Sequence, residues 1–259
     1  MALIDNLLNH KLKRFFSKEI EAGCYLVFGQ RGSGKSTLFA LAAQLNYKNL
    51  PIYSNYGYDN TYSLPYKKIN VHDKKNDKWE TKLVFDKTVL YDFDFHDCFI
   101  LIDEGKTIWS NRDYKNWTAQ DDNFINFLRK NNIVLLVATQ DYEGLDLNLR
   151  KACNLYFYMR RHDLFKNITK IEMYSSEVLP VVDKELEVRS GLFKKPFNLM
   201  SFQVGAVLCG KFNFYRKPYY QYFDTNEIIQ LEKKPPQLKL FDNRNYAEDF
   251  EVLNYDSVS

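Results

Sequence analysis

A glycine-rich run near the N-terminus has the residue types and spacing of a phosphate-binding loop. Gly29–Thr37 reads GQRGSGKST and fits the pattern G-x-x-x-x-G-K-[ST]. The apolar run Cys24–Phe28 before it predicts a strand, and Leu38–Ala43 after it predicts a helix. A helix N-terminus directs backbone N–H groups and the positive end of its dipole at one point, so this context favours a bound phosphate over a chance match.

The whole loop is therefore a candidate binding site for a nucleotide: Gly29, Gln30, Arg31, Gly32, Ser33, Gly34, Lys35, Ser36 and Thr37. In this pattern Lys35 reaches the β- and γ-phosphates, and the Ser36 hydroxyl binds Mg²⁺. We expect ATP and Mg²⁺ as cofactors. Because the sequence shows no base-reading motif, it does not distinguish ATP from GTP.

An acidic pair follows a second apolar run further along the chain. Cys98–Ile102 is uncharged throughout, as in a strand buried on both faces of a parallel sheet, and it ends in Asp103 and Glu104. Ligands of open parallel sheets bind at the carboxyl ends of the strands, so this pair should face the phosphate loop. Asp103 would hold Mg²⁺ through water, and Glu104 would accept a proton from an attacking water. Taken alone, such a pair is merely a solvated strand end.

A third strand, Ile133–Ala138, places a further polar pair, Thr139 and Gln140, at the same edge. A helix predicted over about residues 120–130 would connect the second and third strands by a right-handed crossover. Gln140 is our candidate for a side chain that bonds both the γ-phosphate and the attacking water. The alternative is a strand-end glutamine that bonds nearby backbone.

With these motifs, the sequence resembles a known family, the zonular occludens toxin (Zot) family, whose members include filamentous-phage assembly ATPases. That family belongs to the FtsK/HerA class of DNA-motor ATPases. The resemblance spans about residues 23–227 and is strongest at the nucleotide motifs. It is carried by the Walker motifs Gly29–Thr37 and Phe99–Glu104, by Gln140, and by the segments Ile52–Asn55, Trp109–Arg112, Leu145–Arg150 and Tyr222–Thr225.

The resemblance implies a RecA-like P-loop NTPase, an α/β fold with a mostly parallel central sheet, that hydrolyses ATP to move DNA or assemble particles. A homo-oligomeric ring is also expected, because phosphoryl transfer needs positive charge beyond Lys35 and Mg²⁺ and ring motors receive it as a neighbour's arginine finger. Arg150 matches the family's motif position, and Arg112 is the second candidate. For either residue the alternative is a structural salt bridge.

One departure from the family concerns the membrane. Filamentous-phage members carry a membrane-spanning segment after the ATPase domain, whereas the longest uncharged run here, Pro196–Gly210, is too short to cross a bilayer. The sequence therefore favours DNA packaging or transfer, or an assembly protein docked on a membrane or virion partner. With no secretory signal, and with Cys24, Cys98, Cys153 and Cys209 far apart, we expect reduced cysteines and a location in the host cytoplasm.

The predicted organisation has three parts: an amphipathic helix over residues 1–21, the ATPase domain over 22–230 with a β-hairpin inserted at 67–86, and a flexible tail over 231–259. The helix packs on its own domain or touches a membrane or partner. A net charge of +3 gives no global argument for nucleic-acid binding, so any DNA-binding surface must be local. The lysine-rich hairpin tip is either such a DNA contact or merely a solvated edge. The remaining functional alternatives are a small-molecule kinase and a nucleotide-dependent switch without turnover.

Overall fold

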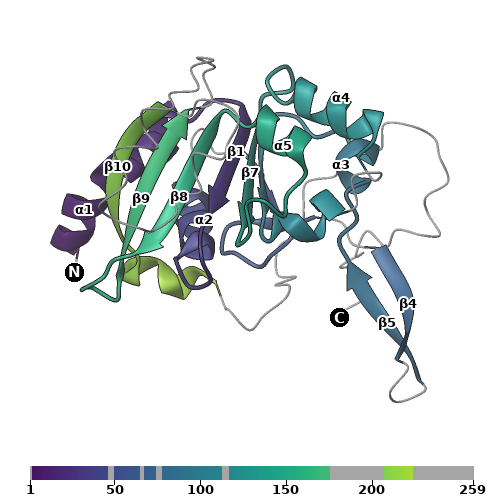
Figure 1. Cartoon of the computed structure of the whole chain (residues 1–259), viewed down its shortest axis with the longest axis horizontal. Helices are drawn as coiled ribbons and strands as arrows, with labels where there is room; N and C mark the ends of the chain where they lie inside the picture. The colour runs from purple at the N-terminus through teal and green to yellow at the C-terminus, as the bar shows by residue number, and fades with distance from the viewer. Residues whose placement is uncertain are drawn as a thin grey trace, which may run out of the picture.

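The computed structural model describes residues 2–45, 50–64, 67–73, 78–112, 117–175 and 207–223 (Figure 1). The predicted tail over 231–259 lies outside the described residues.

An eight-stranded sheet forms the centre of the fold, in the order β10-β9-β8-β1-β7-β6-β2-β3. The strands from β8 to β3 in this order run parallel to one another, and β9 and β10 add antiparallel at one edge. The predicted mostly parallel RecA-like sheet is confirmed. The strands are β1 (Gly23–Phe28), β2 (Ile52–Ser54), β3 (Tyr62–Ser63), β6 (Cys98–Ile102), β7 (Ile133–Thr139), β8 (Leu155–Arg161), β9 (Ile168–Ser175) and β10 (Val207–Tyr215).

Helices cover both faces of this sheet, which explains why its central strands are apolar without interruption. Along β1, Tyr25 and Val27 join the core under α1 and α2, whereas Leu26 and Phe28 join the core under α3, α4 and α5. The helices are α1 (Ala2–Arg14), α2 (Lys35–Gln44), α3 (Val89–Asp92), α4 (Ala119–Phe127) and α5 (Leu147–Ala152). Within the described chain, no helix has the length and apolar character needed to cross a membrane.

The strand order brings three strand ends together. β1 lies beside β7, and β7 lies beside β6, all parallel, so their carboxyl ends meet at one edge. Helix α4 lies between β6 and β7 in the chain, as predicted, and begins with a capping box in which Thr118 and Asp121 bond each other's backbone. The residues that follow the three strands are therefore neighbours.

The N-terminal helix packs along the sheet edge at β10. The buried side chain of Asn9 bonds both backbone groups of Tyr215: Asn9 Nδ2 donates to Tyr215 O at 2.8 Å, and Tyr215 N donates to Asn9 Oδ1 at 2.8 Å. The helix continues as a π-helical turn, Phe15–Glu19, that buries Phe15 and Phe16. Helix α1 thus covers the last edge strand and holds the chain just before Arg216.

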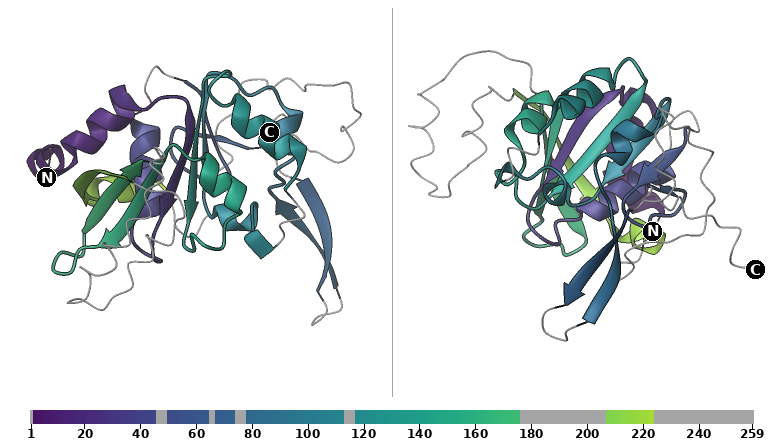
Figure 2. Two further views of the ribbon diagram at one scale, coloured as in Figure 1. Left: turned by 45° about the horizontal axis from the view of Figure 1, so that its top comes forward. Right: turned by 90° about the vertical axis from the view of Figure 1, so that its right-hand side faces the viewer.

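The predicted hairpin is present as a separate two-stranded antiparallel sheet, β4 (Lys67–Asp73) and β5 (Lys78–Val84). It projects away from the body of the molecule in every view (Figures 1 and 2). The tip residues 74–77 lie outside the described residues.

Candidate active site

The loop between β1 and α2 has the backbone of a phosphate cradle. Gly34 caps α2 with φ 98°, in the left-handed region, and an added Cβ would lie 2.4 Å from Cδ of Arg216. A side chain is therefore excluded at Gly34 by both conformation and space. At the start of α2, the Lys35 ammonium donates to the Gly29 carbonyl at 2.8 Å and to the Gln30 carbonyl at 3.3 Å.

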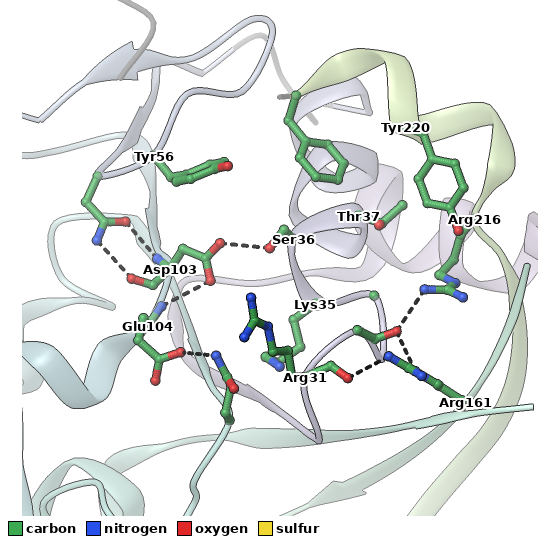
Figure 3. Close-up of a pocket in the computed structure, with 15 residues that line it drawn as sticks. Arg31, Lys35, Ser36, Thr37, Tyr56, Asp103, Glu104, Arg161, Arg216 and Tyr220 are labelled. Carbon is green, nitrogen blue, oxygen red and sulfur yellow. Dashed lines mark hydrogen bonds between the residues drawn. The ribbon is translucent and has the colours of Figure 1, made fainter. Parts of the chain in front are cut away.

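Two arginines and a threonine hold this loop from outside. Arg161 Nε and Arg216 Nη1 both donate to the Gly32 carbonyl at 3.1 Å, and Arg161 Nη2 donates to the Arg31 carbonyl at 3.0 Å (Figure 3). Thr169 Oγ1 donates to the Ser33 carbonyl at 2.6 Å. We call Arg161, Thr169 and Arg216 the outer clamp. The outer clamp thus fixes the carbonyls of Arg31, Gly32 and Ser33 in the loop.

Asp103 lies opposite the loop and is fixed by several contacts. Its Oδ2 accepts from the Ser36 hydroxyl at 2.8 Å and from the Tyr58 hydroxyl at 3.0 Å. Burial, and then the Asp103 charge, raise the pKa of Tyr58 well above its usual value, so this hydroxyl remains a donor. Asn55 bonds the Asp103 backbone twice, donating to its carbonyl at 2.9 Å and accepting from its N–H at 2.7 Å.

Glu104 has a left-handed backbone with φ 56°, which is uncommon for a residue with a side chain. Thr107 stabilises this conformation by donating its N–H and hydroxyl to the Glu104 carbonyl, at 3.0 and 2.9 Å. The next residue, Gly105, passes so close to β7 that an added Cβ would lie 2.2 Å from Val137 Cγ1. The turn places the Glu104 carboxylate beside the end of β7, where Gln140 Nε2 donates to Glu104 Oε2 at 3.0 Å.

The phosphate loop, the acidic pair and Gln140 line one cavity of about 800 Å³. Of the predicted site residues, Arg31, Gly32, Gly34, Lys35, Ser36, Thr37, Asp103, Glu104 and Gln140 line it. Gly29 and Gln30 contribute carbonyls to Lys35, and Ser33 is buried beneath the loop. Three predicted elements, the loop, the acidic pair and Gln140, therefore meet in space.

The cavity is suited to a magnesium nucleotide. Ser36 Oγ and Asp103 Oδ2 present two oxygen donors 2.8 Å apart, the ligand type that Mg²⁺ prefers. Burial lowers the pKa of Lys35, while the charges of Asp103 and Glu104 act in the opposite direction. A buried ammonium that bonds only carbonyls has free capacity for a stronger, anionic acceptor such as a phosphate.

The two candidate arginine fingers do not line this cavity. Arg150 lies on α5 with its guanidinium carbon 4.9 Å from the centroid of the Tyr142 ring. Arg112 is exposed, and its N–H donates to Ser110 Oγ at 3.3 Å. Neither geometry tests a contact with a neighbouring subunit, so both assignments stay predictions.

Sequence reasoning missed the outer clamp, Tyr58, and the aromatic residues Tyr56 and Tyr220 that line the cavity. Asn55 and Phe223 lie in segments that carry the family resemblance, Ile52–Asn55 and Tyr222–Thr225, but the resemblance gives neither residue a role. Single arginines and tyrosines carry no spacing pattern, and only the strand order shows that the ends of β8 and β10 reach the loop.

Three solved structures illustrate what this chain is similar to. The N-terminal domain of zonular occludens toxin from Neisseria meningitidis is 14% identical, with TM-score 0.42 over 79% of this chain and 100% of that chain. The genome packaging NTPase B204 from Sulfolobus turreted icosahedral virus 2, in complex with AMPPCP, is 13% identical, with TM-score 0.40 over 60% and 92%. The flagellar accessory protein FlaH from Methanocaldococcus jannaschii is 10% identical, with TM-score 0.39 over 64% and 83%.

No curated protein matches the sequence. The family model of zonular occludens toxin (Zot), in contrast, matches residues 24–194, which include the phosphate loop, the acidic pair, Gln140 and the first strand of the antiparallel edge. The chain therefore belongs to the Zot family.

Proposed function

We propose that this protein is an ATP-hydrolysing motor that drives DNA packaging, extrusion or transfer during phage assembly. The observation that carries the proposal is that one cavity joins Lys35 and Ser36 with Asp103, Glu104 and Gln140. The chain belongs to the Zot family, which includes filamentous-phage assembly ATPases. This membership supports phage assembly as the process that ATP hydrolysis would drive.

Each residue has a separate task in this reaction. Lys35 exchanges the carbonyls of Gly29 and Gln30 for the β- and γ-phosphates. Ser36 and Asp103 hold Mg²⁺, which neutralises charge on the phosphate oxygens when it is bound.

Glu104 accepts the proton of the attacking water. The hydrogen bond from Gln140 to Glu104 keeps an amide and a carboxylate side by side, so that both can hold one water molecule. The neutral amide can also bond the γ-phosphate without adding charge.

The remaining positive charge is proposed to come from a neighbouring subunit in a ring. Arg150 is the first candidate and Arg112 the second, since neither lines the cavity of its own subunit. In GTPases, an arginine finger of this type raises kcat by about 10³–10⁵.

The proposal is tested by measuring ATP hydrolysis with and without single- and double-stranded DNA, together with the mass of the nucleotide-bound oligomer. Lys35→Ala should abolish hydrolysis, because it removes the charge beside the β- and γ-phosphates. Lys170→Ala removes an ammonium that pairs with exposed Asp163, away from the cavity, and should hydrolyse ATP as the wild type does. Wild-type turnover that stays at background with DNA present would instead indicate a nucleotide-dependent switch.

A further inference from the structure

The cavity extends past the phosphate loop, on the side away from the catalytic acids. Figure 3 shows Thr37, Arg216 and Tyr220 on this side, with Asp103 and Glu104 on the other side of Lys35. Arg216 follows β10 directly, and Tyr220 belongs to the 3-10 helix Lys217–Tyr222. These two residues belong to none of the motifs that define the phosphate site.

The phosphate loop determines which end of a bound nucleotide points toward Arg216 and Tyr220. Lys35 reaches the β- and γ-phosphates, and Glu104 and Gln140 must lie near the γ-phosphate to act on water. The phosphates form a linear chain with the nucleoside at its other end. The α-phosphate and nucleoside therefore leave the loop toward Thr37, Arg216 and Tyr220.

Arg216 is a buried cation that lacks an acidic partner. Only 7% of the residue is exposed, and within the described chain its guanidinium bonds the carbonyls of Gly32 and Lys166 but no carboxylate. Its Nε is buried and has no hydrogen-bond partner among the described residues. Burial lowers the pKa of Arg216; Tyr220 acts in the opposite direction, and the nearby Arg161 charge lowers the pKa further. A buried guanidinium without a carboxylate partner is stabilised by an anion.

Tyr220 offers an aromatic surface beside this charge. The residue is 41% exposed, and the guanidinium carbon of Arg216 lies 5.9 Å from the centroid of its ring. An exposed ring on the wall of a nucleotide cavity can stack on a base, and a neighbouring guanidinium strengthens such stacking.

The amide and carboxylate side chains of the cavity lie on the side of the catalytic acids. Among the described residues that line the cavity, the amides and carboxylates are Asn55, Asp103, Glu104 and Gln140. The Asn55 amide bonds the Asp103 backbone, and the Gln140 amide bonds the Glu104 carboxylate. Among the described residues, Tyr220 therefore recognises a base through its π-face, which every base has.

We propose that Tyr220 and Arg216 form the nucleoside subsite of this cavity. The base stacks on the Tyr220 ring, Arg216 faces the α-phosphate, and adenine and guanine nucleotides are accepted alike. The inference rests on the proposed function, because it assumes that a nucleotide binds in the phosphate loop.

The test compares ligands with and without a nucleoside. Dissociation constants for ATP, GTP and inorganic tripolyphosphate, each with Mg²⁺, are measured by calorimetry for wild type, Tyr220→Ala and Tyr220→Phe. Tyr220→Ala should weaken ATP and GTP by about tenfold each, and tripolyphosphate by less than about twofold, because only stacking is lost. Tyr220→Phe keeps the ring and should bind ATP as the wild type does.

Tyr222→Ala is the matched control. Tyr222 lies in the same 3-10 helix and packs on Tyr219 at 6.3 Å between ring centroids, but it does not line the cavity. It should leave all three affinities unchanged, and thermal melting of each variant reports the fold.

Three results would overturn the subsite: wild-type ATP affinity in Tyr220→Ala, an equal loss of tripolyphosphate and ATP, or a preference of wild type for ATP over GTP above about tenfold. A wild type that binds neither ATP nor tripolyphosphate would refute the proposed function itself, which is a separate outcome.

Discussion

Removal of the Asp121 carboxylate should destabilise the fold strongly. This side chain is completely buried at the start of α4. Oδ1 accepts from Trp109 Nε1 at 2.9 Å and from the Tyr91 hydroxyl, while Oδ2 accepts from Lys87 Nζ at 2.7 Å and from Thr118 N at 2.8 Å. One carboxylate thus joins the region of α3, the segment after Glu104 and the cap of α4.

The magnitude follows from the interactions that Asp121→Ala removes. The Trp109 N–H is buried, and losing its acceptor costs about 1–3 kcal/mol. The Lys87 side chain keeps 16% exposure, so we take the lower end of the range for a broken buried ion pair, about 3 kcal/mol. Loss of the helix cap adds about 1 kcal/mol. Because these groups share one acceptor, the effects overlap, and we expect a total of about 4–5 kcal/mol.

Urea unfolding followed by far-UV circular dichroism measures this difference. The control is Asp122→Ala, which removes the next residue's exposed carboxylate and one hydrogen bond, from Trp117 Nε1 at 2.9 Å. It should change the free energy of unfolding by less than about 1 kcal/mol. If Asp121→Ala is destabilised no more than Asp122→Ala, the assignment of Asp121 as a hydrogen-bonding centre is wrong.

Three further outcomes are expected. Glu104→Gln should keep nucleotide binding and stall hydrolysis, because only the proton acceptor is lost. Single-turnover assays and binding titrations measure the two effects, and a loss of Mg²⁺-dependent binding would contradict the prediction. Arg150→Ala subunits should bind ATP but hydrolyse it about a thousandfold or more slowly, and mixing them with Lys35→Ala subunits should restore some activity; no recovery in demonstrably mixed oligomers would place Arg150 in its own subunit's fold. Burial alone would raise the pKa of Asp121, but the hydrogen bonds, led by that of Lys87, hold it below its usual value. The ionised Asp121 therefore stabilises the fold above its unfolded pKa of about 3.9, and this stabilisation is lost as the pH falls through the lower folded pKa. The difference in free energy of unfolding between wild type and Asp121→Asn should narrow below about pH 4. Urea unfolding at several pH values measures it.

The central strands could be predicted because a strand that is buried on both faces is a continuous apolar run, which is visible in the local sequence alone. Strand β6 spans Cys98–Ile102 as predicted, since its five apolar residues end abruptly at Asp103. Phosphate-loop chemistry is equally local, because the glycines and Lys35 must lie within a single turn. Gln140 is predictable for the same reason: it directly follows a recognisable strand.

Contacts between distant parts of the chain could not be predicted. The N-terminal amphipathic pattern predicts one helix over residues 1–21, but the structure has α1 to Arg14 and then a π-helical turn, in which Phe15 and Phe16 are buried. Tyr58 reaches Asp103 across 45 residues. Such pairings depend on strand order, and strand order is a property of the assembled sheet.

The outer clamp also sets an order of events during synthesis. Arg161 and Arg216 bond the Gly32 carbonyl from 129 and 184 residues further along the chain. At about 5–20 residues per second, the ribosome makes Arg216 on the order of 10–40 s after Gly32. A nascent chain therefore carries the complete phosphate motif long before the clamp can close on it. The family match ends at residue 194, so a fragment cut to that boundary would keep the phosphate loop, the acidic pair and Gln140 and still lack Arg216.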